Sequence, residues 1–187
     1  MKQNLVTEDR VVDAVRDAVA ETLSIDKETV KPESSLINDL EAESLDFLDI
    51  NYRIEQAFGI KMARHFILEH IEEMFGEGSA IDEDGKLTEK AVELLRIRLG
   101  DELPGVTAGT DMDDIPAHIT VQSMASGVMD ILDTLPEKCG SCGASDWKTD
   151  DGARIKCGSC GEPAAFTNGD DLARQWLERT NEEKKIF

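Results

Sequence analysis

The sequence is short of basic residues. Its 20 Lys and Arg face 40 Asp and Glu, which gives a formal net charge of −20 at pH 7. Since proteins hold nucleic-acid phosphates with clustered Lys and Arg, this deficit argues against a nucleic acid as the main partner. An acidic chain is suited instead to partners with basic surfaces.

Long apolar runs are also missing. No run approaches the length of a membrane-spanning helix, and the first residues lack the apolar centre of a signal peptide. We therefore expect a cytoplasmic protein that does not insert into a membrane. Aromatic residues make up 5% of the chain against 40% hydrophobic residues in total, so its core must be mostly aliphatic.

Cysteine is absent before residue 139. The four cysteines then form two Cys-Gly-Ser-Cys-Gly copies, with Cys139 and Cys142 in the first and Cys157 and Cys160 in the second. In a reducing compartment such pairs favour a metal site over disulfides. Two such turns, separated by a predicted β-hairpin from Trp147 to Ile155, predict a tetrahedral Cys₄ site that suits zinc. This region resembles a zinc ribbon.

Other uses of the cysteines fit the spacing less well. Rubredoxin-type iron has similar ligands but a longer spacing and more aromatic neighbours, and a redox Cys-x-x-Cys needs only one pair. Four protein ligands leave a metal no open position for catalysis. A ribbon this small has little apolar core, so we expect it to need the metal to fold.

Charge divides the chain into two regions. Residues 138–187 hold 8 basic and 9 acidic residues, whereas residues 1–137 hold 12 and 31. We predict a helical domain over residues 1–136 and a second domain over residues 137–187, made of the zinc ribbon and a C-terminal helix. That helix is expected from Asp170 or Asp171 to Lys184-Lys185, packed on the ribbon.

Apolar residues at helical spacing predict a mainly α-helical bundle for the first region. Helices are expected after Thr7, over Ser44–Phe58, within Ile60–Phe75, over Glu89–Leu99 before Gly100, and after Thr120. Asp82–Leu87 is similar to the middle of an EF-hand calcium loop, but alanines stand at the first and last ligand positions. A turn before a helix capped by Thr88 is therefore the favoured interpretation.

The histidines show no metal-ligand spacing. His65 and His70 are five residues apart and so do not share a helix face. We expect surface or packing histidines there, and a structural role for His118.

The helix over Ser44–Phe58 has two apolar stripes. One is expected to face the core: Phe47, Ile50, Ile54 and Phe58. The other consists of Leu45, Leu48 and Tyr52, bordered by Asp46, Asp49 and Glu55. Since one stripe is enough for a core, the second indicates either burial on two sides or a surface for a partner.

Residues 1–135 resemble an acyl carrier protein. The resemblance depends on Asp39-Leu40, Glu43-Ser44-Leu45-Asp46 and Phe58-Gly59-Ile60. It is strongest over Thr7–Met62, and residues 76–117 look like an insertion. The expected fold is thus an acyl-carrier-like helical bundle with an inserted helical segment, followed by a small C-terminal β zinc ribbon.

The resemblance implies that a phosphopantetheinyl transferase attaches 4′-phosphopantetheine to Ser44. The thiol of that arm would carry acyl groups as thioesters for fatty-acid, lipid or polyketide-type synthesis, in a monomeric protein that is not itself an enzyme. A helix start suits the phosphate of the arm. The plainer interpretation of Ser44 is an ordinary N-cap serine.

The resemblance also implies that the second stripe docks onto basic patches of acyl-transferring or synthase enzymes. The expected docking residues are Glu43, Leu45, Asp46, Leu48, Asp49, Tyr52 and Glu55. The chain departs from the family at Glu41, where the family usually has Gly, and at Glu43, where it has the Asp that helps hold the transferase's magnesium.

Two other functions stay open. An aminoacyl or peptidyl carrier uses the same serine and arm, although the acidic docking surface favours acyl groups. An unmodified zinc-binding interaction adaptor would need neither. A zinc-binding regulator of nucleic acid is disfavoured by the acidity.

Overall fold

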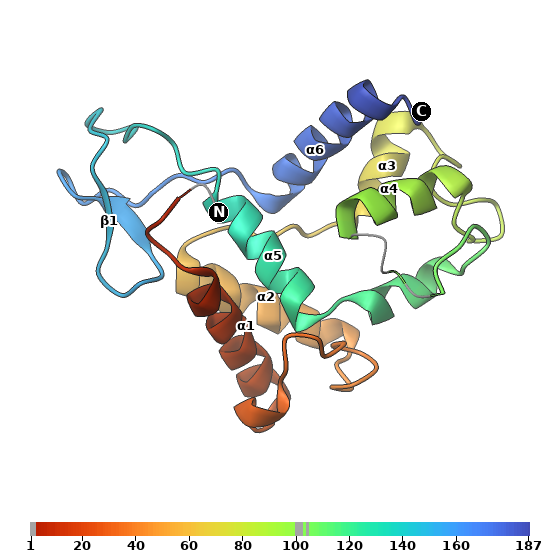
Figure 1. The fold of residues 1–187 in the computed structure, drawn as a ribbon, viewed down its shortest axis with the longest axis horizontal. Helices are drawn as coiled ribbons and strands as arrows, with labels where there is room; N and C mark the ends of the chain where they lie inside the picture. Colours follow the sequence, from red (N-terminus) through yellow and green to blue (C-terminus); the bar gives the residue numbers. More distant parts are fainter. Residues whose placement is uncertain (1–2, 100–102, 104) are drawn as a thin grey trace. The chain divides into compact units, whose positions relative to one another are not determined.

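The computed structural model describes residues 3–99, 103 and 105–187 (Figure 1). Within these ranges the chain is mainly α-helical with one small two-stranded sheet, which confirms the predicted fold class. It forms two compact units: Met1–Met62 with Ile119–Gly169, and Ala63–His118 with Asp170–Phe187. Across the described ranges, no helix combines the length and apolar character needed to cross a membrane.

Helix α1 (Glu8–Leu23) begins where predicted. Thr7 Oγ1 accepts the N–H of Arg10 at 3.3 Å, which satisfies one of the donors that a helix start leaves unpaired. The valines of its apolar stripe, such as Val15, are fully buried. The helix packs against α2 (Ser44–Phe58) and α5 (Val121–Leu132), and these three form the bundle of the first unit.

Two backbone hydrogen bonds fasten the loop between α1 and α2 to the start of α5. The N–H of Leu36 donates to the carbonyl oxygen of Ile119 at 3.0 Å, and the N–H of Val121 donates to that of Ser34 at 3.1 Å. Leu36 is fully buried, as expected of an apolar residue that pins this loop. A short 3₁₀ turn, η1 (Lys27–Thr29), was not predicted.

Helix α2 buries one of its apolar stripes. Ile50, Ile54 and Phe58 are at most 1% exposed, whereas Phe47 of the same stripe is half-buried. Gly59 ends the helix as predicted, and its N–H donates to the carbonyl oxygen of Glu55 at 2.9 Å.

The predicted hairpin is present. Strands β1 (Trp147–Thr149) and β2 (Ile155–Cys157) pair antiparallel, with Trp147 opposite Cys157. Asp151 shapes the turn between them, because its Oδ1 accepts two backbone N–H groups at 2.9 Å. The carboxylate thereby closes the turn of the hairpin, as Asp side chains often do.

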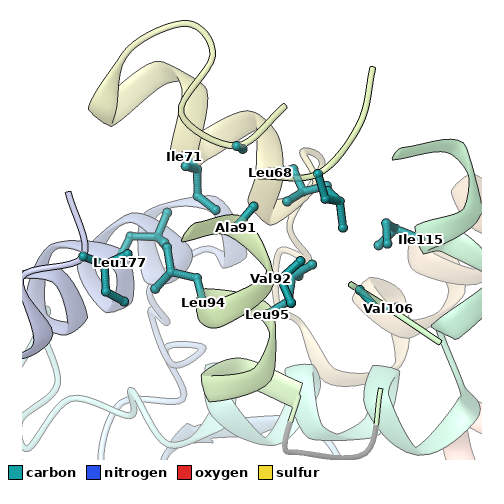
Figure 2. Close-up of a cluster of buried hydrophobic side chains, with 12 residues drawn as sticks. Leu68, Ile71, Ala91, Val92, Leu94, Leu95, Val106, Ile115 and Leu177 are labelled. Carbon is teal, nitrogen blue, oxygen red and sulfur yellow. The ribbon is translucent and has the colours of Figure 1, made fainter. Parts of the chain in front are cut away.

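The second unit has its own apolar core (Figure 2). It lies among helices α3 (Ile67–Phe75), α4 (Glu89–Leu99) and α6 (Gly169–Lys184) and the 3₁₀ helix η2 (Met112–His118), a segment predicted to be mostly loop. Figure 2 shows side chains from α3, α4 and α6 in this core, among them Leu94. The core is aliphatic, as the composition required.

Helix α6 packs elsewhere than predicted. Leu177 is fully buried in the core of the second unit, and Phe187 stacks on Phe75 with ring centroids 4.4 Å apart. The ribbon offers little apolar surface, whereas α3 and α4 leave an apolar face that another amphipathic helix can cover. Of residues 137–187, those up to Gly169 belong to the first compact unit and those from Asp170 to the second.

The Asp82 segment forms the turn predicted before α4. Asp82 Oδ1 accepts the N–H groups of Asp84 at 3.0 Å and Lys86 at 2.9 Å. Thr88 Oγ1 then accepts the N–H of Ala91 at 3.2 Å and caps α4 as predicted. Gly100, predicted to end α4, lies outside the described residues.

Candidate functional site

Ser44 is the first residue of α2, and it is exposed. Within the described part of the chain, no hydrogen bond occupies its hydroxyl. The N-cap is Glu43, with an extended backbone at φ −98° and ψ 169°. The Ser44 hydroxyl therefore does not cap the helix. It lies beside the backbone N–H groups of the first helical turn, which favour a phosphate.

Asp46 closes the start of α2. Its Oδ2 accepts the N–H of Glu43 at 2.7 Å, and its own N–H donates to the carbonyl oxygen of Glu43 at 2.9 Å. These two bonds fix the backbone on both sides of Ser44. Asp46 was predicted as a docking acid, but its carboxylate is engaged within the helix start, while the side chain of Glu43 is exposed.

Glu41 has a left-handed backbone, with φ +57°. This conformation costs a residue with a Cβ about 1–2 kcal/mol relative to the right-handed region. The turn is closed by the Glu41 N–H, which donates to the carbonyl oxygen of Ile37 at 3.1 Å, and it buries Ala42. Glu41 stands where the family usually has Gly. The positive φ at this position explains that preference, because glycine adopts it without strain.

The second stripe of α2 is exposed, as predicted. Leu45, Leu48 and Tyr52 are 76%, 64% and 59% exposed, beside buried neighbours on the same helix. Single exposed apolar residues are ordinary, but three on successive turns next to Ser44 form a continuous stripe. Its role in docking stays a prediction.

Two acids of the predicted docking set are bonded to other residues of the chain, one of them buried and the other partly exposed. Glu55 is only 6% exposed, and its carboxylate accepts the N–H of Met62 and the Nζ of Lys61, both at 3.0 Å. Its placement on the docking surface is therefore corrected. Asp49 accepts from Arg53 Nε at 2.7 Å and from the Thr22 hydroxyl at 2.8 Å, and these bonds lower its pKa.

The four cysteine sulfurs converge at the ribbon. Cys139 Sγ lies 3.7 Å from Cys160 Sγ, and Cys142 Sγ lies 3.6 Å from Cys157 Sγ, with all four within 4.8 Å of one another. A tetrahedral ion with Zn–S bonds of about 2.3 Å separates its sulfurs by about 3.8 Å. The cluster can hold a metal ion.

The two cysteine turns have the same local structure. The N–H of Gly143 donates to the carbonyl oxygen of Cys139 at 2.8 Å, and that of Gly161 donates to Cys157 at 2.9 Å. Both glycines have a left-handed backbone, with φ of +74° and +79°, which explains why Gly follows each pair. The backbone N–H of Cys160 lowers the pKa of the Cys157 thiol to about 7, which favours the thiolate that metals bind. Although backbone N–H groups lower them, the pKa values of Cys142 and Cys160 are raised by the neighbouring sulfurs, that of Cys160 to about 12, so the four thiols do not ionise alike.

Two ribbon side chains, one in β1 and one directly before β2, tie the ribbon to the rest of the first unit. The Arg154 guanidinium donates to the carbonyl oxygen of Gln56 on α2, with Nε at 3.0 Å. Trp147 Nε1 donates to the carbonyl oxygen of Pro136 at 2.7 Å. None of these contacts was visible in the sequence, since they join residues far apart along the chain.

Residues 13–72, which include Ser44, match the family described as "Phosphopantetheine attachment site". The acyl carrier protein AcpXL of Rhizobium meliloti (strain 1021) is 58% identical over 50 residues, 27% of this chain and 53% of that protein. AcpXL of Brucella melitensis biotype 1 is 56% identical over 50 residues, 27% of this chain and 54% of that protein.

The chain thus spans about half the length of these AcpXL relatives. No solved structure matches it. An acyl carrier protein of Campylobacter curvus (strain 525.92) is 46% identical over 52 residues, 28% of this chain and 68% of that protein. With that share of a relative covered, this chain belongs to the acyl carrier protein family.

Proposed function

We propose that Ser44 carries 4′-phosphopantetheine and that the protein holds acyl groups as thioesters for fatty-acid, lipid or polyketide-type synthesis. The observation that carries this proposal is the exposed Ser44 hydroxyl, which stands at the N-terminus of α2 and makes no hydrogen bond to any residue that the structure describes. The family match over residues 13–72 supports the same position.

The chain's own residues prepare the modification. Ser44 Oγ would attack the pyrophosphate of coenzyme A at the phosphorus next to the pantetheine, break the P–O–P bond and release adenosine 3′,5′-bisphosphate, while the hydroxyl proton passes to a base of the transferase. The thiol of the attached arm would then supply the thioester chemistry. The N–H groups of the first turn of α2 favour the added negative charge. Leu45, Leu48 and Tyr52 would contact acyl-transferring partners, and Glu43 would face the transferase. The protein is itself a monomeric, cytoplasmic carrier rather than an enzyme.

Intact-mass measurement after incubation with coenzyme A and a phosphopantetheinyl transferase tests the proposal. We expect a mass gain of one phosphopantetheine group in the natural protein and none in Ser44→Ala. Ser126→Ala, an exposed serine on α5, is the matched control and should be modified normally. No gain with several transferases would overturn the carrier function and favour an unmodified adaptor.

The ion we propose for the four cysteines is Zn²⁺. The sulfur separations fit tetrahedral zinc, and the short hairpin has little apolar core of its own. Metal analysis of the purified protein should find zinc at one equivalent in this site. Iron in its place, with the absorption of an iron–sulfur centre, would overturn the assignment.

A further inference from the structure

We propose that His65, His70 and Asp170 form a second metal site, for a divalent transition-metal ion of the zinc class. All three residues belong to the second unit: His65 precedes α3, His70 lies within α3, and Asp170 lies in the first turn of α6. Their ligand atoms lie within 4.8 Å of one another. None of them takes part in the Ser44 or cysteine sites.

The spacing of the three groups suits an ion. Asp170 Oδ1 lies 3.1 Å from His70 Nε2 and 3.5 Å from His65 Nδ1. Ligand atoms bound to one ion at about 2.0–2.1 Å stand about 3.0–3.4 Å apart, so the first separation lies within this range and the second just above it. Two imidazoles with one carboxylate are a donor set that zinc-class ions bind well.

A second carboxylate holds His70 in place. Glu73 Oε2 lies 3.5 Å from His70 Nδ1, and Arg174 lies 3.4 Å from the same oxygen. Without an ion, the shorter contact, 3.1 Å from Nε2 to Asp170 Oδ1, is a hydrogen bond that the Nε2–H tautomer or the protonated ring donates. With an ion, Nε2 would bind it and Nδ1–H would point toward Glu73. Because His70 is fully buried, its ring is fixed in this orientation. Metal-binding histidines are commonly oriented in this way.

Asp170 supplies negative charge. The backbone N–H groups of Arg64 and His65 both donate to Asp170 Oδ1 at 3.1 Å, and they hold the carboxylate beside the two imidazoles. The side chain of His65 is 48% exposed. It leaves a route for an ion to enter and room for water in the remaining coordination positions.

Metal stoichiometry of the full chain tests this site. The protein is first loaded with one equivalent of Zn²⁺, which the cysteines take, and is then dialysed against micromolar free Zn²⁺. We expect two ions per chain in the natural protein and one in His65→Ala, whose exposed position leaves folding intact. His118→Ala removes the third histidine of the chain and should retain two ions.

Two further measurements separate a metal site from a hydrogen-bonded cluster. Co²⁺ at the second site should give weak visible bands without the sulfur charge-transfer absorption that the cysteine site produces. Glu73→Gln should weaken the second ion by about 10–100-fold while the first is unaffected. One ion in the natural protein, or two retained in His65→Ala, would overturn the proposal, whatever the outcome at Ser44.

Discussion

The helical bundle and the ribbon of the first unit differ in where the candidate site lies relative to the centre of the fold. In the bundle, Phe58 and its neighbours fill the core on one side of α2, while Ser44 stands exposed at its end. In the ribbon, Cys139 and Cys157 are buried, Cys142 and Cys160 are exposed, and the four sulfurs converge on one point. We therefore expect the bundle to stay folded without the Ser44 hydroxyl, whereas we expect the fold of the ribbon to depend on the cysteines of its candidate site.

Metal removal from the cysteines should have the largest effect. Structural zinc contributes about 10–16 kcal/mol of apparent binding free energy in zinc-finger peptides, so a chelator, or Cys157→Ser, should unfold the hairpin. The Trp147 indole resonance in NMR spectra reports this, while circular dichroism of the bundle helices should persist. Ser141→Ala, within a cysteine turn, is the control. An unchanged Trp147 signal after metal removal would show that the ribbon stays folded without a metal, contrary to this prediction.

Phe58→Ala should have the opposite effect. Removing this buried ring from the bundle is expected to cost about 3–5 kcal/mol of unfolding free energy, measured in urea. Metal binding by the cysteines should be unchanged under native conditions. Leu48→Ala, on the exposed side of the same helix, should change the stability by less than about 0.5 kcal/mol. Equal losses in the two variants would show that α2 is buried on both sides.

Leu48→Asp separates function from folding in the bundle. We expect an unchanged unfolding free energy but a loss of at least about 1 kcal/mol in partner recognition, or about fivefold in kcat/KM for acyl loading by the cognate enzyme. Ile97→Asp, an exposed apolar residue of the second unit, is the matched control. Normal loading of the Leu48 variant would remove the exposed stripe from the docking surface.

Glu41→Gly should stabilise the bundle slightly. Relief of the left-handed backbone is partly offset by the greater freedom of glycine in the unfolded chain, so a gain of about 0.5–1 kcal/mol is expected in chemical denaturation. Glu33→Gly, at a position without positive φ, should be neutral or destabilising. A loss in both variants would mean that the Glu41 side chain makes a favourable contribution of its own.

Arg53→Gln should have the smallest effect, because the pair with Asp49 is exposed. The folded pKa of Asp49 lies below its unfolded value, so the stabilisation is present above the ordinary Asp pKa of about 3.9 and is lost as pH falls through the folded pKa. The variant should be less stable than the natural protein at pH 7, and urea titrations should converge below about pH 4. If the difference in unfolding free energy between the two proteins persists in acid, the effect is due to packing of the apolar part of the arginine side chain.

The features that the sequence predicted well are local. Thr7 and Thr88 cap helices as expected, because an N-cap depends on residues three positions apart. The two cysteine turns are each five residues long, so their spacing alone fixes where the sulfurs point. Helical periodicity placed Leu48 on the second stripe of α2 but left open whether that stripe would be buried or exposed.

The features that could not be predicted join distant segments. Glu55 falls beside the exposed stripe by periodicity, but the chain beyond α2 folds back so that Met62 and Lys61 cover it. His65 precedes the N-cap of α3, so helical spacing says nothing of its distance from His70. Asp170 is 100 residues from His70, and no sequence pattern links them.

The contact between Arg154 and Gln56 places a positive charge at the C-terminal end of the α2 dipole. The last turn of α2 holds no basic residue of its own, although its unpaired carbonyl groups carry partial negative charge. Arg154 brings a guanidinium to one of those carbonyl groups from 98 positions away along the chain. The ribbon thus provides the C-terminal cation of the helix whose other end presents Ser44, and a ribbon that unfolds without its metal withdraws that charge.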